Sequence, residues 1–356
     1  MKTRALAIYA GRKAAESLAR DGWSPEQFDL LLGASGGPKW FVLSQLDRLL
    51  FGDYLKTRQR PLAVLGSSIG SWRHACLATA DPAAAISRME AGYLYQEYST
   101  ERPGADEISE VSLGILQSTL GDSGAAELVS NELIHSHIVT ARGRGAAAAT
   151  TTPLLATGMG VAALGNTLSR ELLRLSFQRV VFHTGSAAAP QMHFDDFDSC
   201  YATLSADSVT RALHASGAIP FVLTGERNLP GAPPGQYWDG GIIDYHFDLA
   251  QYHGEGLILY PHFSANLVPG WFDKFLPWRR AALHQEEKLV MLCPSQEFIA
   301  DLPQGKIPDR NDFGRMSAED RIHYWETCVE RCKALAEEFA ELIAGKDPLA
   351  GVRVFD

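Results

Sequence analysis

An α/β fold built around a mostly parallel central sheet is the architecture that this sequence predicts. Short runs rich in Val, Ile and Leu recur along the chain without the polar alternation of half-solvated strands, which is typical of strands buried on both faces of a sheet. Segments with helical character separate these runs, and strands that alternate with helices indicate parallel pairing. In such folds the loops at the carboxyl ends of the strands usually hold the functional residues.

The predicted strands cover residues 28–34, 62–66, 137–141, 179–184, 256–260 and 288–292, and the helices between them include 38–50, 71–77 extending toward 95, 164–177 and 205–214. The clearest helical pattern lies at about 318–344, where apolar residues recur every three or four positions. Ser317 and Asp320 form a capping box at its start, and Gly345 follows its end. We expect this helix to pack on the sheet, and its apolar stripe also leaves a coiled-coil dimer seam open.

Length and composition predict a single globular domain over residues 1–356. Hydrophobic residues make up 46% of the chain and charged residues 21%, which are ordinary values for a packed protein. The 32 Lys and Arg against 42 Asp and Glu give a net charge of −10, which argues against a nucleic-acid partner held by a basic surface. The five cysteines form no Cys-x-x-Cys pair, so we expect reduced thiols, and we assign no metal and no cofactor.

Two segments bear on cellular location. The apolar run at residues 5–10 is stopped by Arg12 and Lys13, so it is too short for the core of a secretory signal. The stretch 146–168 is rich in Ala, Thr and Gly and falls short of the strongly apolar composition of a spanning helix. We therefore expect a cytoplasmic protein, with peripheral membrane contact left open.

The first candidate for chemistry is the glycine-rich segment Gly33 to Trp40, which follows a predicted strand and precedes a helix that Pro38 would start well. Glycines at a helix N-terminus let unpaired backbone N–H groups approach an anion or an oxyanion. A dinucleotide-binding turn fits less well, because no acidic residue ends the next strand. A P-loop is excluded because Trp40 follows Lys39 where that motif has Ser or Thr. A tight turn without a ligand remains the simpler alternative.

The second candidate is the Gly-x-Ser-x-Gly motif formed by Gly66, Ser68 and Gly70. It lies directly after the strand at 62–66 and before a helical stretch, which is the context that a nucleophile elbow requires. Small residues two positions before and after the serine are needed because the sharp turn crowds neighbouring backbone. The alternative is a serine that only caps a helix.

The third candidate is Asp239, followed by Gly240 and Gly241 after a proline-rich loop. Alone, Asp-Gly-Gly indicates a turn. The upstream segment at 212–223, Ala-Leu-His-Ala-Ser-Gly-Ala-Ile-Pro-Phe-Val-Leu, changes that interpretation because of its place in the order of motifs.

In this order the motifs resemble those of the patatin-like phospholipase family. The family has a glycine-rich oxyanion loop, then Gly-x-Ser-x-Gly, Ala-Ser-x-Ala-x-Pro and Asp-Gly-Gly, which correspond here to residues 33–39, 66–70, 215–220 and 239–241. The resemblance covers roughly residues 28–250. It implies a three-layer α/β/α sandwich and a serine acyl hydrolase that cleaves carboxylic esters of lipids through a Ser–Asp dyad and an acyl-enzyme.

Carried over residue by residue, the resemblance implies that Ser68 is the nucleophile and Asp239 the base. The oxyanion hole would consist of backbone N–H groups of Gly36, Gly37 and Ile69. The supporting residues are Lys39, Gly66, Gly70, Gly240 and Gly241.

The chain departs from the family pattern at two places. The family loop usually reads Asp-Gly-Gly-Gly-x-Arg-Gly, and here the corresponding residues are Ala34, Ser35, Gly36, Gly37, Pro38, Lys39 and Trp40. After Asp-Gly-Gly the family often has Asn-Asn-Pro, where this chain has Asp244, Tyr245 and His246. The retained glycines favour an intact oxyanion site in a divergent, bacterial-type member whose substrate differs from the common phospholipid.

Other functions stay open at this point. A Ser-His-Asp esterase would use His246, His262 or His284, which all follow Asp239 in the permitted chain order. His74 and His183 are more typical of structural histidines. A non-catalytic module that binds lipids or acyl groups is the other alternative, because a fold does not fix an activity.

The segment 266–283 combines aromatic and basic residues, a composition suited to a lipid interface. We expect possible partners to include a lipid or acyl-ester substrate, with peripheral membrane contact through Trp271, Phe272 and Trp278. A buried loop or an oligomer contact would produce the same composition.

Overall fold

A computed structural model describes residues 4–196, 198–280 and 286–355. In this part of the chain the strands form one sheet in the order β11-β1-β10-β9-β2-β3-β4-β5-β6, with β7 and β8 attached beside β4. The strands are β1 (Leu6–Ala10), β2 (Phe28–Gly33), β3 (Leu62–Ser67), β4 (Ile134–Gly143), β5 (Phe177–His183), β6 (Ser199–Thr203), β7 (Glu226–Arg227), β8 (Gln236–Asp239), β9 (Leu257–Pro261), β10 (Leu289–Pro294) and β11 (Val352–Val354).

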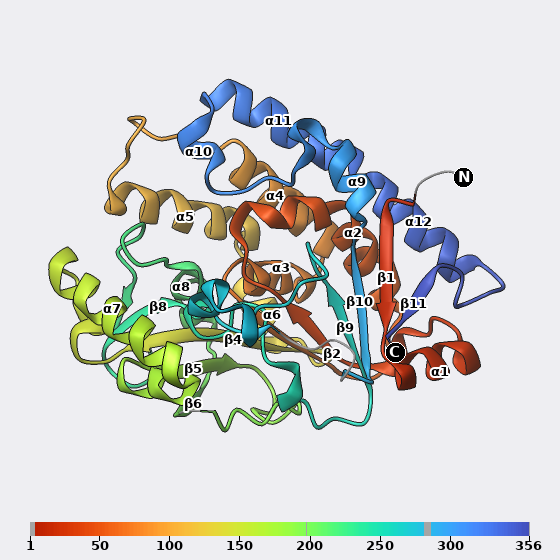
Figure 1. Ribbon diagram of the computed structural model, residues 1–356, viewed down its shortest axis with the longest axis horizontal. Coiled ribbons are helices and arrows are strands. Elements are labelled where there is room, and N and C mark those ends of the chain that lie inside the picture. The colour runs from red at the N-terminus through yellow and green to blue at the C-terminus, as the bar shows by residue number, and fades with distance from the viewer. Residues whose placement is uncertain (1–3, 197, 281–285, 356) are drawn as a thin grey trace.

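Helices flank this sheet, which gives the predicted α/β fold its three-layer α/β/α arrangement (Figure 1). They are α1 (Arg12–Asp21), α2 (Ser44–Leu49), α3 (Ile69–Leu77), α4 (Pro82–Leu94), α5 (Ala105–Leu120), α6 (Gly124–Ser130), α7 (Thr152–Leu168), α8 (Ala206–Gly217), α9 (Gln296–Asp301), α10 (Asp312–Arg315), α11 (Ala318–Arg331) and α12 (Lys333–Ala344). In Figure 1, α4, α5 and α11 lie above the strands, and α7 lies at the lower left.

The centre of the sheet is parallel and buried, as the unbroken apolar runs predict. β10, β9, β2, β3 and β4 pair in parallel in that order, and every residue of β3, β9 and β10 is buried. Antiparallel pairs flank this core, where β1 meets β10 and β5 meets β4. Each of the six predicted strands is present, within three residues at each end.

Four predicted helices differ from the structure. The segment predicted at 38–50 begins as a 3₁₀ helix over Gly37–Leu43 before α2, and the helix predicted from 71 toward 95 is divided into α3 and α4. The other two differ in position or continuity. The helix predicted at 164–177 is wrong in position, because α7 covers Thr152–Leu168 and the chain then forms a short 3₁₀ helix, η6 (Arg170–Leu175), before β5. Pro153 occupies the first turn of α7. A backbone N–H there would have no partner within the helix, so a proline, which has no N–H, fits this position well. The helix predicted at about 318–344 is divided into α11 and α12 at Cys332. The buried side chains of α12 include Phe339, whose ring packs edge-on against Tyr54.

The carboxyl ends of two strands meet on one edge of β4. β3 runs parallel to β4 and ends with Ser67 opposite Val139. β8 runs antiparallel to β4 and ends with Asp239 opposite Thr140, the next residue along. Because β5 occupies the other edge of β4 over the same residues, β3 and β8 approach each other from opposite directions. The residues that follow β3 therefore lie beside the end of β8.

Candidate active site

Ser68 lies on a sharp turn between β3 and α3. Its backbone has φ 55° and ψ −130°, a conformation that costs a non-glycine residue of the order of 1–3 kcal/mol and that is concentrated at functional sites. Gly66 pairs with Gly33 of β2. A Cβ atom on Gly70 would lie 2.0 Å from the carbonyl oxygen of Gly33, so only glycine allows α3 to begin this close to β2. This is the strand-turn-helix geometry that the Gly-x-Ser-x-Gly motif predicts.

The turn places Ser68 beside Asp239. Ser68 Oγ donates a hydrogen bond of 2.8 Å to Asp239 Oδ2, and both side chains are buried. Asp239 Oδ1 accepts a 2.7 Å hydrogen bond from the N–H of Gly241. The two residues that the motifs select are thus in direct contact, with one carboxylate oxygen on the serine and the other held by the backbone.

Burial sets the electrostatics of this pair. It raises the pKa of Asp239 to about 6, although the hydrogen bonds from Ser68 and from the Gly241 N–H favour the charged form. A carboxylate with a pKa near 6 is still mostly ionised at neutral pH and is a better proton acceptor than an exposed one. This protonation behaviour suits a general base.

Ser216 holds the turn in place and was not singled out from the sequence. Its Oγ accepts a 2.9 Å hydrogen bond from the N–H of Ser68 and donates one of 2.7 Å to the carbonyl of Val139. Ser216 lies in α8, and Ala218, the residue directly after α8, holds Asp239, because the N–H of Asp239 donates to the carbonyl of Ala218 at 2.8 Å. The Ala-Ser-Gly-Ala-Ile-Pro segment at 215–220 contains both Ser216 and Ala218. The sequence therefore pointed to this segment, although it assigned no role to either residue.

The glycine-rich loop follows β2 on the same edge of the sheet. Gly36 precedes and Gly37 begins a 3₁₀ helix, η2 (Gly37–Leu43), and Ile69 begins α3. N–H groups in the first turn of a helix have no acceptor within that helix. The Asp-Gly-Gly turn packs against this loop, since a Cβ atom on Gly241 would lie 2.4 Å from Ser35 Oγ. The predicted oxyanion residues and the dyad therefore lie together, where β2, β3 and β8 end.

Gly240 starts the 3₁₀ turn η7 (Gly240–Ile242) directly after Asp239. Lys39, the other supporting residue, lies in η2 with its ammonium 4.9 Å from the centre of the Phe263 ring. Burial lowers the pKa of Lys39.

Two further cations approach the dyad and were not assigned to it from the sequence. Lys274 places its ammonium 3.6 Å from the centre of the Tyr245 ring, and a Cβ atom on Gly37 would lie 3.6 Å from the Arg310 guanidinium. Burial, together with the charges of Lys39 and Arg310, lowers the pKa of Lys274 to about 7. Arg310 had no sequence signal, because it comes from the loop before α10, far from every motif.

The histidines of the alternative triad do not contact Ser68 in the described residues. His246 Nδ1 accepts a hydrogen bond from the N–H of Val268, and its ring lies 4.3 Å from that of His262. His262 Nδ1 lies 2.9 Å from the N–H of Ser264. Burial lowers the pKa of both rings, to about 3 for His262. His284 lies outside the described residues.

A buried ion-pair network holds the segment after the Asp-Gly-Gly turn. Arg179 of β5 contacts Asp244 through two hydrogen bonds of 2.6 and 2.9 Å, and it also contacts Asp196. Arg170 of η6 binds Asp244 and the carbonyl of Ile243. Asp244, which stands where the family often has asparagine, therefore anchors to the sheet the segment that follows Asp239.

Within the described part of the aromatic segment, residues 266–280, only some of the aromatic side chains are at the surface. Trp271 and Trp278 are 40% and 71% exposed, whereas Phe272 is 8% exposed and packs against Phe177. Phe272 is therefore not available for surface contact, contrary to the expectation from the sequence. Phe275, in the same 3₁₀ turn η9 (Trp271–Phe275), is 79% exposed instead.

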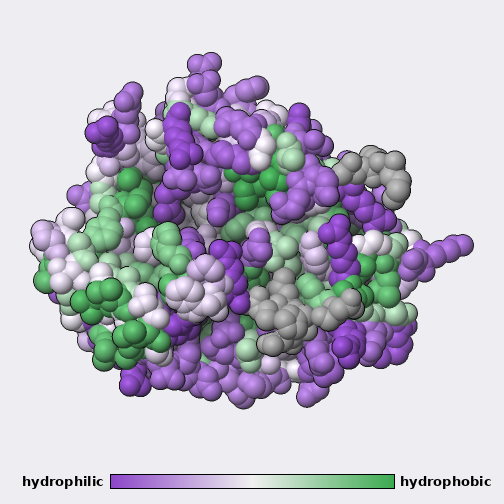
Figure 2. All heavy atoms as spheres, in the orientation of Figure 1, coloured by the Kyte–Doolittle hydropathy of each residue, from purple (hydrophilic) through white to green (hydrophobic). Residues whose placement is uncertain are grey.

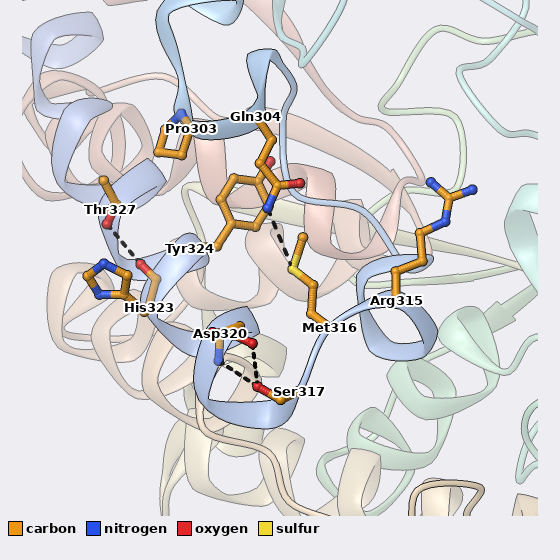
Figure 3. A pocket seen from close by; sticks show the side chains of 9 residues that line it. All are labelled: Pro303, Gln304, Arg315, Met316, Ser317, Asp320, His323, Tyr324 and Thr327. Carbon is orange, nitrogen blue, oxygen red and sulfur yellow. Dashed lines mark hydrogen bonds between the residues drawn. The ribbon is translucent and has the colours of Figure 1, made fainter.

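A surface pocket lies elsewhere in the molecule. Its lining side chains come from the 303–304 turn, the end of α10 and the first turns of α11, and neither Ser68 nor Asp239 belongs to it (Figure 3). Several of its polar groups bond one another, such as Ser317 with Asp320. Across the described ranges, no group of three His, Cys, Asp or Glu side chains is arranged to hold a metal ion.

Comparison with known proteins gives one structural match. The crystal structure of VipD from Legionella pneumophila is similar with a TM-score of 0.32 and 12% sequence identity, over 100% of this chain and 76% of that chain. No protein-family model and no curated protein matches the sequence. Of the helices described here, none has both the length and the apolar character needed to cross a bilayer.

Proposed function

We propose that this chain is a serine acyl hydrolase of the patatin-like type, which cleaves carboxylic esters of lipids. The observation that carries the proposal is the 2.8 Å hydrogen bond from Ser68 Oγ to Asp239 Oδ2. A serine hydroxyl is a weak nucleophile until a base accepts its proton, and this carboxylate is within reach to do so without a histidine.

The reaction would proceed in two halves. Ser68 Oγ attacks the ester carbonyl carbon while its proton passes to Asp239, and the carbonyl oxygen becomes an oxyanion that N–H groups of Gly36, Gly37 and Ile69 would bind. Collapse of this intermediate breaks the ester C–O bond, and Asp239 returns the proton to the departing alcohol. Water then attacks the acyl-enzyme, with Asp239 as the base, and releases the carboxylic acid and free Ser68.

The site favours this reaction over the two alternatives. For a Ser-His-Asp mechanism, His246 and His262 are directed to backbone groups rather than to Ser68. A binding module without catalysis does not need the strained backbone of Ser68 or the buried carboxylate of Asp239, and both features destabilise the folded protein.

Three cations at the site support a finer proposal about the substrate. The charge of Arg310 lowers the pKa of both Lys39 and Lys274, and the charge of Lys39 lowers that of Lys274, so an anion placed among these cations would relieve their repulsion. We therefore expect the preferred ester to carry a negatively charged group beside the scissile bond, as lipids with an anionic head group do.

Labelling with a fluorophosphonate probe tests the nucleophile directly, because the probe phosphonylates an activated serine. Wild-type protein is expected to react, and Ser68→Ala to lose the label. Ser67→Ala is the matched control, since Ser67 is the adjacent serine of the same motif and its Oγ accepts a hydrogen bond only from Ser35 among the contacts described. Equal labelling of wild type and Ser68→Ala would overturn the proposal.

A further inference from the structure

Helix α7 presents an apolar surface that the rest of the described chain does not cover. Its 17 residues include no charged side chain. Leu154, Val161, Leu164 and Leu168 are 51%, 55%, 71% and 81% exposed, and their spacing of seven, three and four places them on one face of the helix. The solvent-facing side of a surface helix is normally polar.

Neighbouring turns extend this surface. η6 and η9 both contact α7 and add Leu175 at 66% exposure and Phe275 at 79%. The next 3₁₀ turn, η10 (Pro277–Arg279), adds Trp278. Figure 2 shows hydrophobic residues gathered at the left of the molecule, over the position of α7 in Figure 1. We call this surface, the exposed residues of α7, η6, η9 and η10, the apolar face.

The apolar face is held rigidly and is linked to the candidate active site. Asn166 of α7 donates a 2.6 Å hydrogen bond to Asp273 of η9, and Arg170 bridges Asp273 and Asp244. η9 turns Phe275 to solvent and Lys274 toward Tyr245, beside the dyad. One short segment thus contributes to both the apolar face and the surroundings of Asp239.

Charge indicates what the apolar face contacts. The chain as a whole has a net charge of −10, yet exposed Arg174 and Arg280 and partly exposed Arg279 lie at the edge of this face, with Glu171 as the acidic residue of η6. Local positive charge around apolar and tryptophan side chains is complementary to anionic lipid head groups. A second copy of this acidic chain offers no comparable attraction.

We propose that the apolar face seats the protein on the surface of an anionic lipid bilayer as a peripheral protein. Leucines of α7 and Phe275 would enter the acyl boundary, and Trp271 and Trp278 would lie at the level of the head groups. The binding itself is independent of catalysis; that the bound lipid is delivered to Ser68 rests on the proposed function.

Vesicle co-sedimentation tests the binding in a Ser68→Ala background, where no lipid is hydrolysed. The probe is vesicles of phosphatidylglycerol and phosphatidylcholine, compared with phosphatidylcholine alone. Leu164→Ser with Leu168→Ser, and Phe275→Ser with Trp278→Ser, are each expected to weaken binding to the anionic vesicles by about tenfold or more. Leu133→Ser with Val354→Ser removes exposed apolar residues elsewhere and should leave binding unchanged.

Two outcomes overturn the proposal. Undiminished vesicle binding by both apolar-face variants shows that the face does not contact lipid. Sedimentation of the Ser68→Ala protein as a dimer that the same variants dissociate assigns the face to contact between copies of the chain. Because Ser68→Ala is used throughout, these results do not depend on hydrolysis, and a failure to label or hydrolyse would instead count against the proposed function.

Discussion

Ser68 Oγ and Asp239 Oδ2 are joined by a 2.8 Å hydrogen bond although 171 positions separate the two residues in the chain. The pairing of β3 and β8 with consecutive residues of β4, Val139 and Thr140, creates this contact. Both side chains follow or end a buried strand and are themselves buried. Proton transfer between them therefore needs no rearrangement of the backbone.

Replacing either member of the dyad should abolish hydrolysis of a p-nitrophenyl acyl ester. Ser68→Ala removes the nucleophile and Asp239→Asn removes the base, so each is expected to lower kcat by about a thousandfold or more. His246→Gln and His262→Gln are the controls and should keep substantial activity. A comparable loss in either histidine variant, with the fold intact by circular dichroism, would restore the triad.

The same Asp239→Asn variant should be more resistant to unfolding at neutral pH. Burial raises the pKa of Asp239 from 3.8 to about 6, so the folded state binds its proton more tightly than the unfolded state does. The protonated side chain of Asp239 therefore stabilises the folded state at low pH, and this stabilisation is lost as pH rises through about 6. Urea unfolding of the wild type and of Asp239→Asn at pH 4 and pH 8 compares their free energies of unfolding. A larger increase in the variant at pH 4 than at pH 8 contradicts this expectation.

Activity should rise with pH across the pKa of Asp239. The carboxylate must be ionised to accept the proton of Ser68, so kcat/KM for a neutral ester is expected to fall on the acidic side with a midpoint at about pH 6. A pH profile in a series of buffers gives the midpoint. A midpoint near 4 would indicate a carboxylate exposed to water, and the burial of the site would not explain it.

Gly37→Ala should lower kcat more than it raises KM. An N–H group aimed at the oxyanion acts mainly in the transition state, so the expected loss is of the order of a hundredfold in kcat. Gly37 has φ 55°, and an alanine there is strained. Gly145→Ala is the matched control, because Gly145 has φ 53° with no atom within 4 Å of an added Cβ. An effect on KM alone would assign the loop to binding of the ground state.

Removing the cations should discriminate between anionic and neutral esters. Lys274→Met and Arg310→Met are expected to raise KM for an ester with an adjacent phosphate by about tenfold, with little change for a neutral ester of the same acyl chain. Since burial lowers the pKa of Lys274 to about 7, wild-type KM for the anionic ester should also rise above that pH. Equal changes for both esters point to a structural role instead.

The network around Asp244 should be important for stability. Arg179→Met removes a buried cation that Asp244 and Asp196 share, with Arg170 still in contact with both carboxylates, which is expected to cost about 3–5 kcal/mol in the free energy of unfolding. Arg144→Met breaks the more exposed pair with Asp198 and should cost about 1 kcal/mol or less. Urea denaturation compares the two, and similar losses would mean that burial of the network is not decisive.

Local signals in the sequence determined the sheet and the candidate dyad. Unbroken apolar runs predicted the strands, because a strand buried on both faces cannot tolerate polar alternation. The glycines around Ser68 indicated the sharp turn, because the elbow brings backbone atoms too close for a side chain. The Asp-Gly-Gly segment indicated a site only through its place in the order of the motifs. Its contact with Ser68 depends on the pairing of β8 with β4.

The start of α7, the separation of Phe272 from the surface and the positions of Lys274 and Arg310 were decided by tertiary structure alone. An uncharged Ala, Thr and Gly stretch has no amphipathic period that reveals where its helix begins or which face stays exposed. Lys274 reaches Tyr245, and Arg310 reaches Gly37, from segments that are distant in the chain and come together only when the sheet has formed. The hydrophobic pattern of a segment indicates how that segment is buried. A site built from the ends of several strands depends instead on how the sheet brings those strands together.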